Sequence, residues 1–275
     1  MIIPKKEVVQ LSENIRKIID GHNIDLRDNR EGKLSILKND IHTLANQLSE
    51  QAYNSEKEKE LLRGTLADIS HQIKTPLTSM SIMIDLLEGT PPDKQSEFIA
   101  NIKTSLTRTE WLVSALLKLA KLESGAITFS RGSTTAAELS ELALKPLQIL
   151  LDVKNQTIKM NGDTPLVCDK RWTSEALTNI LKNASEYSPN GGVVTIESGE
   201  NPICSWLSVT DSGNGLTRAE IATLFRRFEG SRSKHGIGIG LPLSLAIMRG
   251  QNGDIEAENA EGGGAKFTIK FYKAT

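Results

Sequence analysis

The chain has 275 residues, of which 38% are hydrophobic and 24% charged, values typical of a soluble globular protein with about two domains. Its 33 basic and 34 acidic residues give a formal net charge of -1, so no basic excess indicates a nucleic-acid or anionic-membrane partner, and we expect no nucleic-acid binding. The two cysteines, Cys168 and Cys204, form no CxxC motif, which favours a reducing compartment and argues against a disulfide or zinc framework.

Residues 1–54 are predicted to form a helical linker, with amphipathic stretches at about Lys5 to Asp20 and Ser35 to Ser49. No apolar run here or later reaches the roughly 20 residues that span a bilayer, and the start of the chain is not a signal peptide. We therefore expect a cytoplasmic chain, tethered to a membrane through a segment outside it.

Pro4, Gly21 and Glu31-Gly32 resemble the landmarks of a HAMP signal-relay module with one residue missing. Residues 1–54 are therefore either HAMP-like or an ordinary dimerising linker.

Residues 55–124 are predicted to form a helical hairpin. Apolar residues recur at spacings of three and four along its first arm, namely Leu66, Ile69, Ile73, Leu77, Met80, Ile84 and Leu87. The sequence GTPPD at 89–93 ends that helix. A second stripe follows, made of Phe98, Ile102, Leu106, Val113, Leu116 and Leu119. Because one hairpin buries little core, we expect a homodimer in which both stripes form a four-helix bundle.

Residues 130–275 are predicted to form a second domain, because glycine clusters and alternating strands begin after Gly125. We expect a helix at 171–187, a turn at 189–192, and strands near 193–197, 205–210 and 265–271. The last strand, KFTIKF, alternates polar and apolar residues, as a sheet with one face in water requires. The fold class is therefore α+β, with the helical hairpin followed by an α/β sandwich.

His71, in DISHQIKTPLT, is the first candidate for chemistry. Two residues, at about 100° each, separate it from Ile69 and from Ile73, so its imidazole points away from the apolar stripe toward solvent. A neutral imidazole has a ring nitrogen free to attack phosphorus. A lone surface histidine usually has no function, but Pro76 should kink or loosen the helix just after it, a costly feature in a regular bundle.

Two further patterns are suited to nucleotide binding. Asn179 and Asn183 lie on one face of the predicted helix, which Tyr187 extends, and their amides could serve a magnesium ion held mainly by phosphates. Asp211 follows a predicted strand in VTDSGNGL and could accept a hydrogen bond from the adenine amine, while Gly213 and Gly215 allow a tight turn beside it. Each pattern is weak alone, since helix asparagines and Asp-Gly turns are common.

The fourth pattern is LFRRFEGSRSKHGIGIGLPLS. Gly236, Gly238 and Gly240 precede a predicted helix, whose backbone amides can receive phosphate. The polar segment 230–235, with Arg232 and Lys234, suits a lid over the phosphates. The GxGxG spacing differs from the GxGxxG of a dinucleotide-binding fold, which excludes that alternative.

The order of these motifs resembles that of the orthodox histidine kinases over residues 60–275. The resemblance implies that His71 is the phosphoacceptor, that Asn183 binds Mg²⁺, and that Asp211 reads adenine. It implies an ATP-binding domain of the histidine kinase, Hsp90 and gyrase type. It also implies that Phe225 to Phe228 form an aromatic hinge of the lid, that Arg227 lies near the phosphates, and that the lid ends on the nucleotide at Gly236, Gly238 and Gly240. The remaining expected ATP contacts are Asn179, Tyr187, Gly213, Gly215 and Leu241.

The chain departs from the family pattern at Gln72, where the family usually has an acidic residue that accepts the imidazole proton. An amide can orient the ring but cannot take up a proton, so we expect either slower autophosphorylation or a proton that leaves through water. Thr75 matches the position that orients a water for dephosphorylating the partner, so phosphatase activity is also expected. Glu186 replaces a frequent cation near phosphate, and either Lys182 or the cations of the lid are expected to compensate for its charge.

Two other classes compete with this interpretation. ATP-hydrolysing clamps of the gyrase, Hsp90 and MutL type have a carboxylate four residues before the magnesium asparagine, where this chain has Asn179, which cannot act as a base. A silent dimerisation module is suggested only by Gln72. The resemblance therefore implies Mg²⁺- and ATP-dependent autophosphorylation of His71, followed by transfer to an aspartate in a response regulator receiver domain. The input signal, the cognate regulator and the choice between cis and trans transfer are not specified by the sequence.

Overall fold

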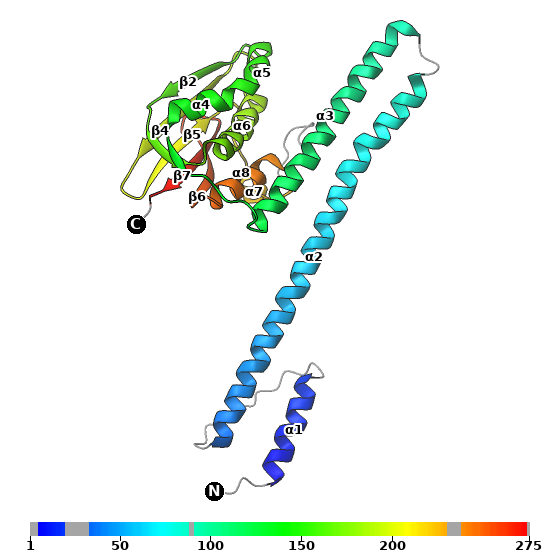
Figure 1. Cartoon of the computed structure of the whole chain (residues 1–275), viewed down its shortest axis with the longest axis vertical. Helices are drawn as coiled ribbons and strands as arrows, with labels where there is room; N and C mark the ends of the chain where they lie inside the picture. The colour runs from blue at the N-terminus through cyan, green and yellow to red at the C-terminus, as the bar shows by residue number, and fades with distance from the viewer. Residues whose placement is uncertain (1–4, 20–32, 88–90, 230–237, 274–275) are drawn as a thin grey trace. The chain divides into compact units, whose positions relative to one another are not determined.

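The computed structural model describes residues 5–19, 33–87, 91–229 and 238–273. The chain forms two compact units, Met1–Ile69 and Ser70–Thr275 (Figure 1). The elements are α1 (Lys5–Ile19), α2 (Lys33–Leu87), α3 (Pro92–Glu123), β1 (Gly132–Thr135), α4 (Ala136–Leu144), the 3-10 helix η1 (Lys145–Leu147), α5 (Gln148–Val153), β2 (Thr157–Asn161), β3 (Pro165–Cys168), α6 (Lys170–Tyr187), β4 (Val193–Glu200), β5 (Cys204–Thr210), α7 (Arg218–Thr223), α8 (Gly240–Arg249), β6 (Gly253–Asn259) and β7 (Ala265–Tyr272).

The first unit consists of α1 and the first part of α2. Both are amphipathic stretches that the sequence predicts as helices, and α2 then runs without a break to Leu87. The predicted boundary after residue 54 therefore lies inside a continuous helix. Pro4, Gly21 and Glu31-Gly32, on which the HAMP-like interpretation depends, lie outside the described residues, so that interpretation stays a prediction.

The second unit begins with the predicted helical hairpin, which the structure confirms as the end of α2 and the whole of α3. Pro91 is the N-cap of α3 and Pro92 its first residue, the position where a missing amide proton costs no helical hydrogen bond. Several apolar residues of both arms are exposed in the single chain, including Leu77, Ile84, Leu106 and Val113. Toward its C-terminal end α3 turns Leu112, Ala115 and Leu119 into the core of the α/β domain. The hairpin therefore has both a covered face and an uncovered apolar face.

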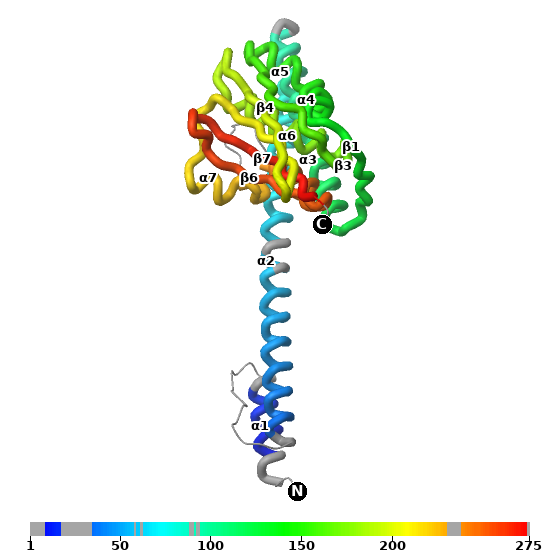
Figure 2. The backbone as a smooth tube through the Cα atoms, turned by 90° about the vertical axis from the view of Figure 1, so that its left-hand side faces the viewer, coloured from blue at the N-terminus to red at the C-terminus, as the bar shows by residue number. Residues whose placement is uncertain are grey.

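The α/β domain has a five-stranded mixed sheet in the order β2-β4-β5-β7-β6, in which β2 and β4 are parallel and the other pairs antiparallel. Alternate residues of β7 are buried, which is the predicted period of two. Buried residues of the sheet and of α4, α6 and α8 form one core. Figure 1 labels these helices and strands, and Figure 2 shows the same domain turned by 90°. A separate antiparallel pair, β1 with β3, extends the domain. The predicted α+β class, with an α/β sandwich after the hairpin, is confirmed.

The core of this domain explains why its helices form where they do. Ala176, Leu177, Ile180 and Ala184 of α6 recur at spacings of three and four and are fully buried. The register places Val209 of β5 between Ile196 of β4 and Phe267 of β7 on the same face of the sheet. Burial of these side chains holds α6 and the ends of the central strands in fixed relation, which is what positions the candidate site. Among the described helices, none is long and apolar enough to cross a membrane.

Candidate functional site

His71 lies on α2 in the second unit, and its side chain is exposed. The Thr75 hydroxyl donates a 3.0 Å hydrogen bond to the backbone carbonyl of His71, one helical turn earlier. Pro76 lies within α2, and the helix continues past it; the expected kink or loosening at this position stays a prediction. Gln72, the next residue, is half-buried. The arrangement leaves an imidazole in solvent on a rigid helix, with a threonine oxygen nearby that keeps its lone pairs as acceptors.

Helix α6 carries the candidate magnesium and phosphate ligands. Its N-cap is Asp169, whose carboxylate accepts from the amides of Arg171 and Trp172, both at 3.1 Å. Asn179 is half-buried, and its Nδ2 donates to the carbonyl of Gly240 and to the hydroxyl of Ser244, both at 3.4 Å. The two long hydrogen bonds bring the middle of α6 against the first turn of α8.

Asn183 lies one turn further along α6 than Asn179 and is half-buried. Within the described part of the chain its amide makes no hydrogen bond, so its oxygen is available to a ligand. Lys182 and Glu186, on the exposed side of the helix, form an ion pair at 3.9 Å. The Lys182 ammonium also lies 5.8 Å from the ring centroid of Trp111 on α3. The expected compensation of Glu186 by Lys182 therefore has a geometric basis.

Asp211 directly follows β5 and is 4% exposed. Its Oδ1 accepts from the amides of Gly213 at 2.8 Å and Ala265 at 3.0 Å. Two backbone donors therefore fix the orientation of the carboxylate. Among the described residues nothing donates to Oδ2, which leaves one carboxylate oxygen for an external donor such as an amine.

Gly213 places the Asp211 turn against the end of α6, because a Cβ there would lie 2.7 Å from the carbonyl oxygen of Tyr187. Gly215 has φ +72° and lies beside the side chain of Asn259. Asn259 accepts from the amide of Leu216 at 2.6 Å and donates to its carbonyl at 2.8 Å. The predicted DxGxG residues thus form one turn that is held at both ends.

Gly264 lies against this turn, and no sequence motif above includes it. A Cβ at Gly264 would lie 1.9 Å from the carbonyl oxygen of Asp211, closer than atoms can approach. The signal that could have identified it is the glycine cluster at 262–264, which precedes β7. Its function is to let β7 hydrogen-bond next to Asp211.

The predicted aromatic hinge lies after α7. Phe225 and Phe228 are partly buried against the domain core. Phe228 adopts a left-handed backbone, with φ 64°, and its amide donates to the carbonyl of Gly238 at 3.0 Å. This bond joins Phe228 to Gly238. A Cβ at Gly238 would crowd the Phe228 backbone. The predicted residue Gly236 lies outside the described residues.

Arg227, between the two phenylalanines, forms an ion pair with Glu123 at the C-terminal end of α3. Partial burial lowers the pKa of the Arg227 guanidinium from its ordinary value, but a guanidinium stays cationic at physiological pH.

Gly240 begins α8, and Leu241 next to it is buried. The first turn of α8 has no side-chain cap, so its amides are available to an anion.

The arrangement fits a nucleotide better than a metal bound by protein alone. Within the described ranges, no group of three or more His, Cys, Asp or Glu side chains could hold a metal ion. Mg²⁺ is commonly bound through one or two protein oxygens together with substrate phosphates. Asn183 lies one helical turn from Asn179, which contacts the uncapped start of α8, and it suits that second mode.

The structure brings Asn179, Gly240, Tyr187, Gly213 and Asp211 together through the contacts described above. In the described part of the chain, His71 makes no hydrogen bond or ion pair with any of them.

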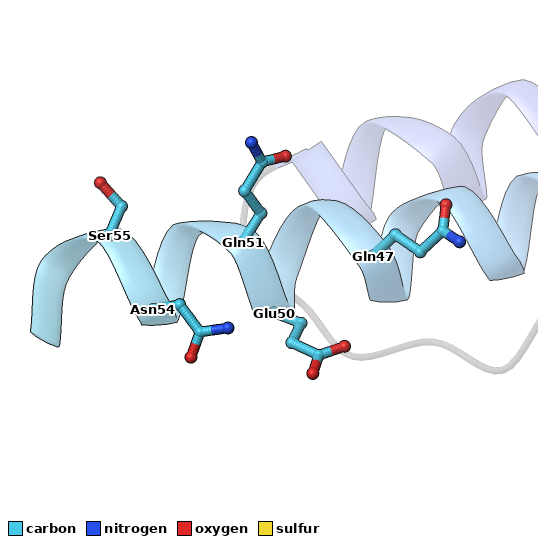
Figure 3. A pocket seen from close by; sticks show the side chains of 5 residues that line it. All are labelled: Gln47, Glu50, Gln51, Asn54 and Ser55. Carbon is cyan, nitrogen blue, oxygen red and sulfur yellow. The ribbon is translucent and has the colours of Figure 1, made fainter. Parts of the chain in front are cut away.

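A separate shallow depression lies in the first unit (Figure 3), lined by the exposed α2 side chains Gln47, Glu50, Gln51, Asn54 and Ser55. It contains none of the predicted site residues, and its lining comes from a single helix.

Two family models match the chain. Residues 61–125 match the His Kinase A (phospho-acceptor) domain, and residues 168–275 match the histidine kinase-, DNA gyrase B- and HSP90-like ATPase domain. The first match contains His71 and the second contains Asn179, Asn183 and Asp211. The order of the two domains is the one that the sequence motifs imply.

Known proteins agree with this assignment. Sporulation kinase C of Bacillus subtilis is 32% identical over 211 residues, which cover 74% of this chain and 47% of that protein. Histidine kinase AdeS of Acinetobacter baumannii has the same fold, with a TM-score of 0.64 over 74% of this chain and 98% of that chain at 24% identity. The structure of histidine kinase ThkA in complex with response regulator protein TrrA gives a TM-score of 0.66 over 82% of this chain and 66% of that chain at 21% identity.

The chain spans about half the length of the curated relatives it matches. Over that length it has the phospho-acceptor hairpin followed by the ATPase-type domain in one polypeptide. Because it matches both family models and resembles known sensor kinases, the chain belongs to the orthodox sensor histidine kinase family.

Proposed function

We propose that this chain transfers the γ-phosphoryl group of ATP to His71 and then relays it to an aspartate in a response regulator. The observation that carries the proposal is an exposed histidine in a phospho-acceptor hairpin followed by an ATPase-type domain with an oriented, half-free carboxylate at Asp211. Neither part alone distinguishes a kinase from an ATP-binding clamp. Together they supply both an acceptor and a donor site.

In the transfer step, a ring nitrogen of His71 forms a bond to the γ-phosphorus while the bond from that phosphorus to the β,γ-bridging oxygen breaks. ADP leaves, and the ring nitrogen that did not attack loses its proton. Gln72 cannot accept that proton, so it passes to water. The contribution of the chain is placement and charge neutralisation more than covalent chemistry.

We assign the following residues to the ATP site. Oδ2 of Asp211 would accept from the exocyclic amine of adenine, Tyr187 and the turn at Gly213 and Gly215 would line the base, and the first turn of α8 would receive phosphate. Asn179, Phe225, Phe228, Gly238 and Leu241 would frame the same site, and Gly236 is assigned to it by sequence. Mg²⁺, bound by Asn183 and the phosphates, would neutralise charge on the phosphoryl group.

We further propose that the chain acts as a homodimer, because Leu77, Ile84, Leu106 and Val113 are exposed in a single copy and a second hairpin would bury them.

The receiver domain would dock on the hairpin near His71; the relative ThkA likewise forms a complex with response regulator protein TrrA. Thr75 would orient a water for dephosphorylation of the regulator, since its hydroxyl proton is used by the His71 carbonyl. The membrane tether and the segment boundaries at residues 54, 55, 124 and 130 stay predictions.

The proposal is tested by incubating the chain with γ-labelled ATP and magnesium and measuring acid-labile label on the protein. His71→Ala should abolish the label, and removal of magnesium should do the same. His42→Ala is the matched control, because His42 is the other histidine of α2 and should leave labelling unchanged.

The remaining outcomes separate the alternatives. Label that survives His71→Ala would contradict the assignment of the acceptor. Release of inorganic phosphate without labelled protein would favour an ATP-hydrolysing clamp, and absence of Mg·ATP binding would favour a silent dimerisation module.

A further inference from the structure

The C-terminal end of α6 is held by two side chains from another part of the chain. A helix leaves its last four carbonyl groups without helical partners, and α6 has no basic residue in its last turn to satisfy them. The partners come instead from Lys154 and Gln156, which lie between α5 and β2. We call Lys154 and Gln156 the carbonyl clamp.

The carbonyl clamp uses almost every donor it has. Lys154 Nζ lies 2.5 Å from the carbonyl oxygen of Ser185, 3.2 Å from that of Glu186 and 3.1 Å from that of Ser188. An ammonium group has three donors, so all of them are directed at this helix end. The positive charge also stabilises the negative end of the helix dipole.

Gln156 repeats the pattern. Its Nε2 lies 3.0 Å from the carbonyl oxygen of Ser185, and 3.1 Å from those of Ser188 and Pro189. Its Oε1 accepts from the Ser185 hydroxyl at 2.6 Å. Ser185 and Ser188 are buried, so water cannot replace the donors to these two carbonyls without opening the domain, whereas Glu186 is half-buried and Pro189 is exposed.

The helix end that the clamp holds is bonded directly to the Asp211 turn. The hydroxyl of Ser188 accepts from the amide of Ser212 at 3.1 Å. The hydroxyl of Ser212 in turn accepts from the amide of Val193, at the start of β4, at 3.1 Å. Gly213 rests against the carbonyl of Tyr187. Displacement of residues 185–189 would therefore move the carboxylate of Asp211 relative to Asn183 and Tyr187.

We infer that Lys154 and Gln156 are positioning residues for the nucleotide site, which fix the separation between the α6 ligands and Asp211. The inference rests on the proposed function, because it concerns the affinity of that site for Mg·ATP. Neither residue reaches the proposed ligand. Their effect passes through backbone carbonyls and the Ser188 to Ser212 hydrogen bond.

The backbone around the clamp is itself fixed, which makes the side chains effective. Asn155, between the two clamp residues, adopts φ 50°, a conformation that asparagine tolerates better than most residues. The amide of Gly191 donates to the carbonyl of Lys154 at 2.8 Å, and the amide of Thr157 to that of Gly192 at 3.0 Å. The clamp is thus anchored to the turn that follows α6.

The test compares Lys154→Met and Lys154→Arg with the native chain. Methionine keeps most of the apolar stem but has no donor, and Lys159→Met is the matched control because Lys159 is exposed on β2. We expect Lys154→Met to raise the dissociation constant for Mg·ATP and its KM about tenfold, with kcat at saturation within about twofold, since lost hydrogen bonds to a charged donor act on binding. Lys154→Arg should lie between, because the charge remains but the donor geometry changes.

Two readouts separate positioning from stability. Binding is measured well below the melting temperature of each variant, so that every variant is folded. Amide hydrogen exchange, measured without nucleotide, should rise in Lys154→Met at residues 185–188 and 211–213 and stay unchanged in Lys159→Met.

The outcomes are distinguishable. Native affinity for Mg·ATP in Lys154→Met, or unchanged exchange at 211–213, would overturn the inference while leaving the proposed function intact. A native chain that binds no Mg·ATP would overturn the proposed function, and the exchange measurement would then still decide whether the clamp holds the Asp211 turn.

Discussion

The guanidinium of Arg227 forms an ion pair with the carboxylate of Glu123. Arg227 is the residue whose sequence position implies a contact with phosphate, whereas Glu123 is the last residue of α3. The two roles compete, because guanidinium donors that are directed at the Glu123 carboxylate are not available to ATP. The pair therefore competes with the proposed nucleotide contact.

Glu123→Gln should raise the rate of autophosphorylation by releasing Arg227. The side chains are 33% and 50% exposed, and ion pairs at such sites contribute about 0.2–1 kcal/mol, so the increase should be at most about fivefold. The initial rate of His71 labelling at low ATP concentration checks this. Glu141→Gln, an exposed substitution on α4, is the control, and an unchanged or slower rate for Glu123→Gln would contradict the prediction.

Gln72→Glu should also raise the rate of autophosphorylation, for a different reason. A carboxylate beside His71 can take up the imidazole proton as the other ring nitrogen is phosphorylated, which an amide cannot do. The measurement is the rate at saturating Mg·ATP, where ATP affinity no longer contributes. Gln47→Glu introduces the same change on an exposed part of α2 (Figure 3) and should have no effect. A rate that stays constant or falls in Gln72→Glu would refute the idea that the chain lacks its proton acceptor.

Asp211→Asn should weaken ATP binding at least about tenfold with little change in stability. The Asn oxygen can still accept from the amides of Gly213 and Ala265, so the turn is kept. The new amide group takes the place of Oδ2, and it cannot accept from the adenine amine. Calorimetric titration with Mg·ATP checks the affinity, and thermal unfolding checks the fold.

A matched control for Asp211→Asn is Asp163→Asn. Asp163 is exposed and accepts from the amide of Ala137 at 2.9 Å, far along the chain from the candidate ligands. ATP affinity should be unaffected there, and equal losses in the two variants would mean that Asp211 does not read the base.

Gln251→Ala should destabilise the α/β domain by about 1–3 kcal/mol, because it leaves buried groups without partners. Gln251 is 4% exposed. Its Oε1 accepts from the amide of Asp169 at 2.6 Å, and its Nε2 donates to Thr173 and to the carbonyl of Ile247 at 3.2 and 3.3 Å. Denaturant unfolding measures the change. Gln148→Ala, at an exposed position, should change stability by less than about 0.5 kcal/mol, and equal effects of both substitutions would contradict the argument.

The elements that follow a regular period could be predicted from the sequence. The predicted helix at 171–187 is α6, and the predicted strands near 193, 205 and 265 are β4, β5 and β7, with bounds that differ by up to three residues. These segments have strong local patterns, since β7 alternates buried and half-buried residues along its whole length.

Other features depend on contacts between residues far apart in the chain, which leave no periodic signal. The parallel pairing of β2 with β4 is one example, because β2 is short and mostly exposed. The bond of Asn259 with Leu216 and that of Lys154 with Ser185 are others. A lysine in a loop and an asparagine at a strand end have no distinctive pattern until the path of the chain brings their partners close. The motifs thus indicate which residues would touch ATP, but not the residues that hold them in place.

The close approach of Gly264 to Asp211 links two positions that are otherwise independent in sequence. Any β-carbon at 264 must displace the carbonyl of Asp211, and with it the carboxylate that we propose reads adenine. Substitutions at Gly264 would therefore be selected against through loss of nucleotide discrimination, even where the rest of the domain could absorb the strain. In a library of variants selected for signalling, position 264 should remain glycine as strictly as position 211 remains aspartate.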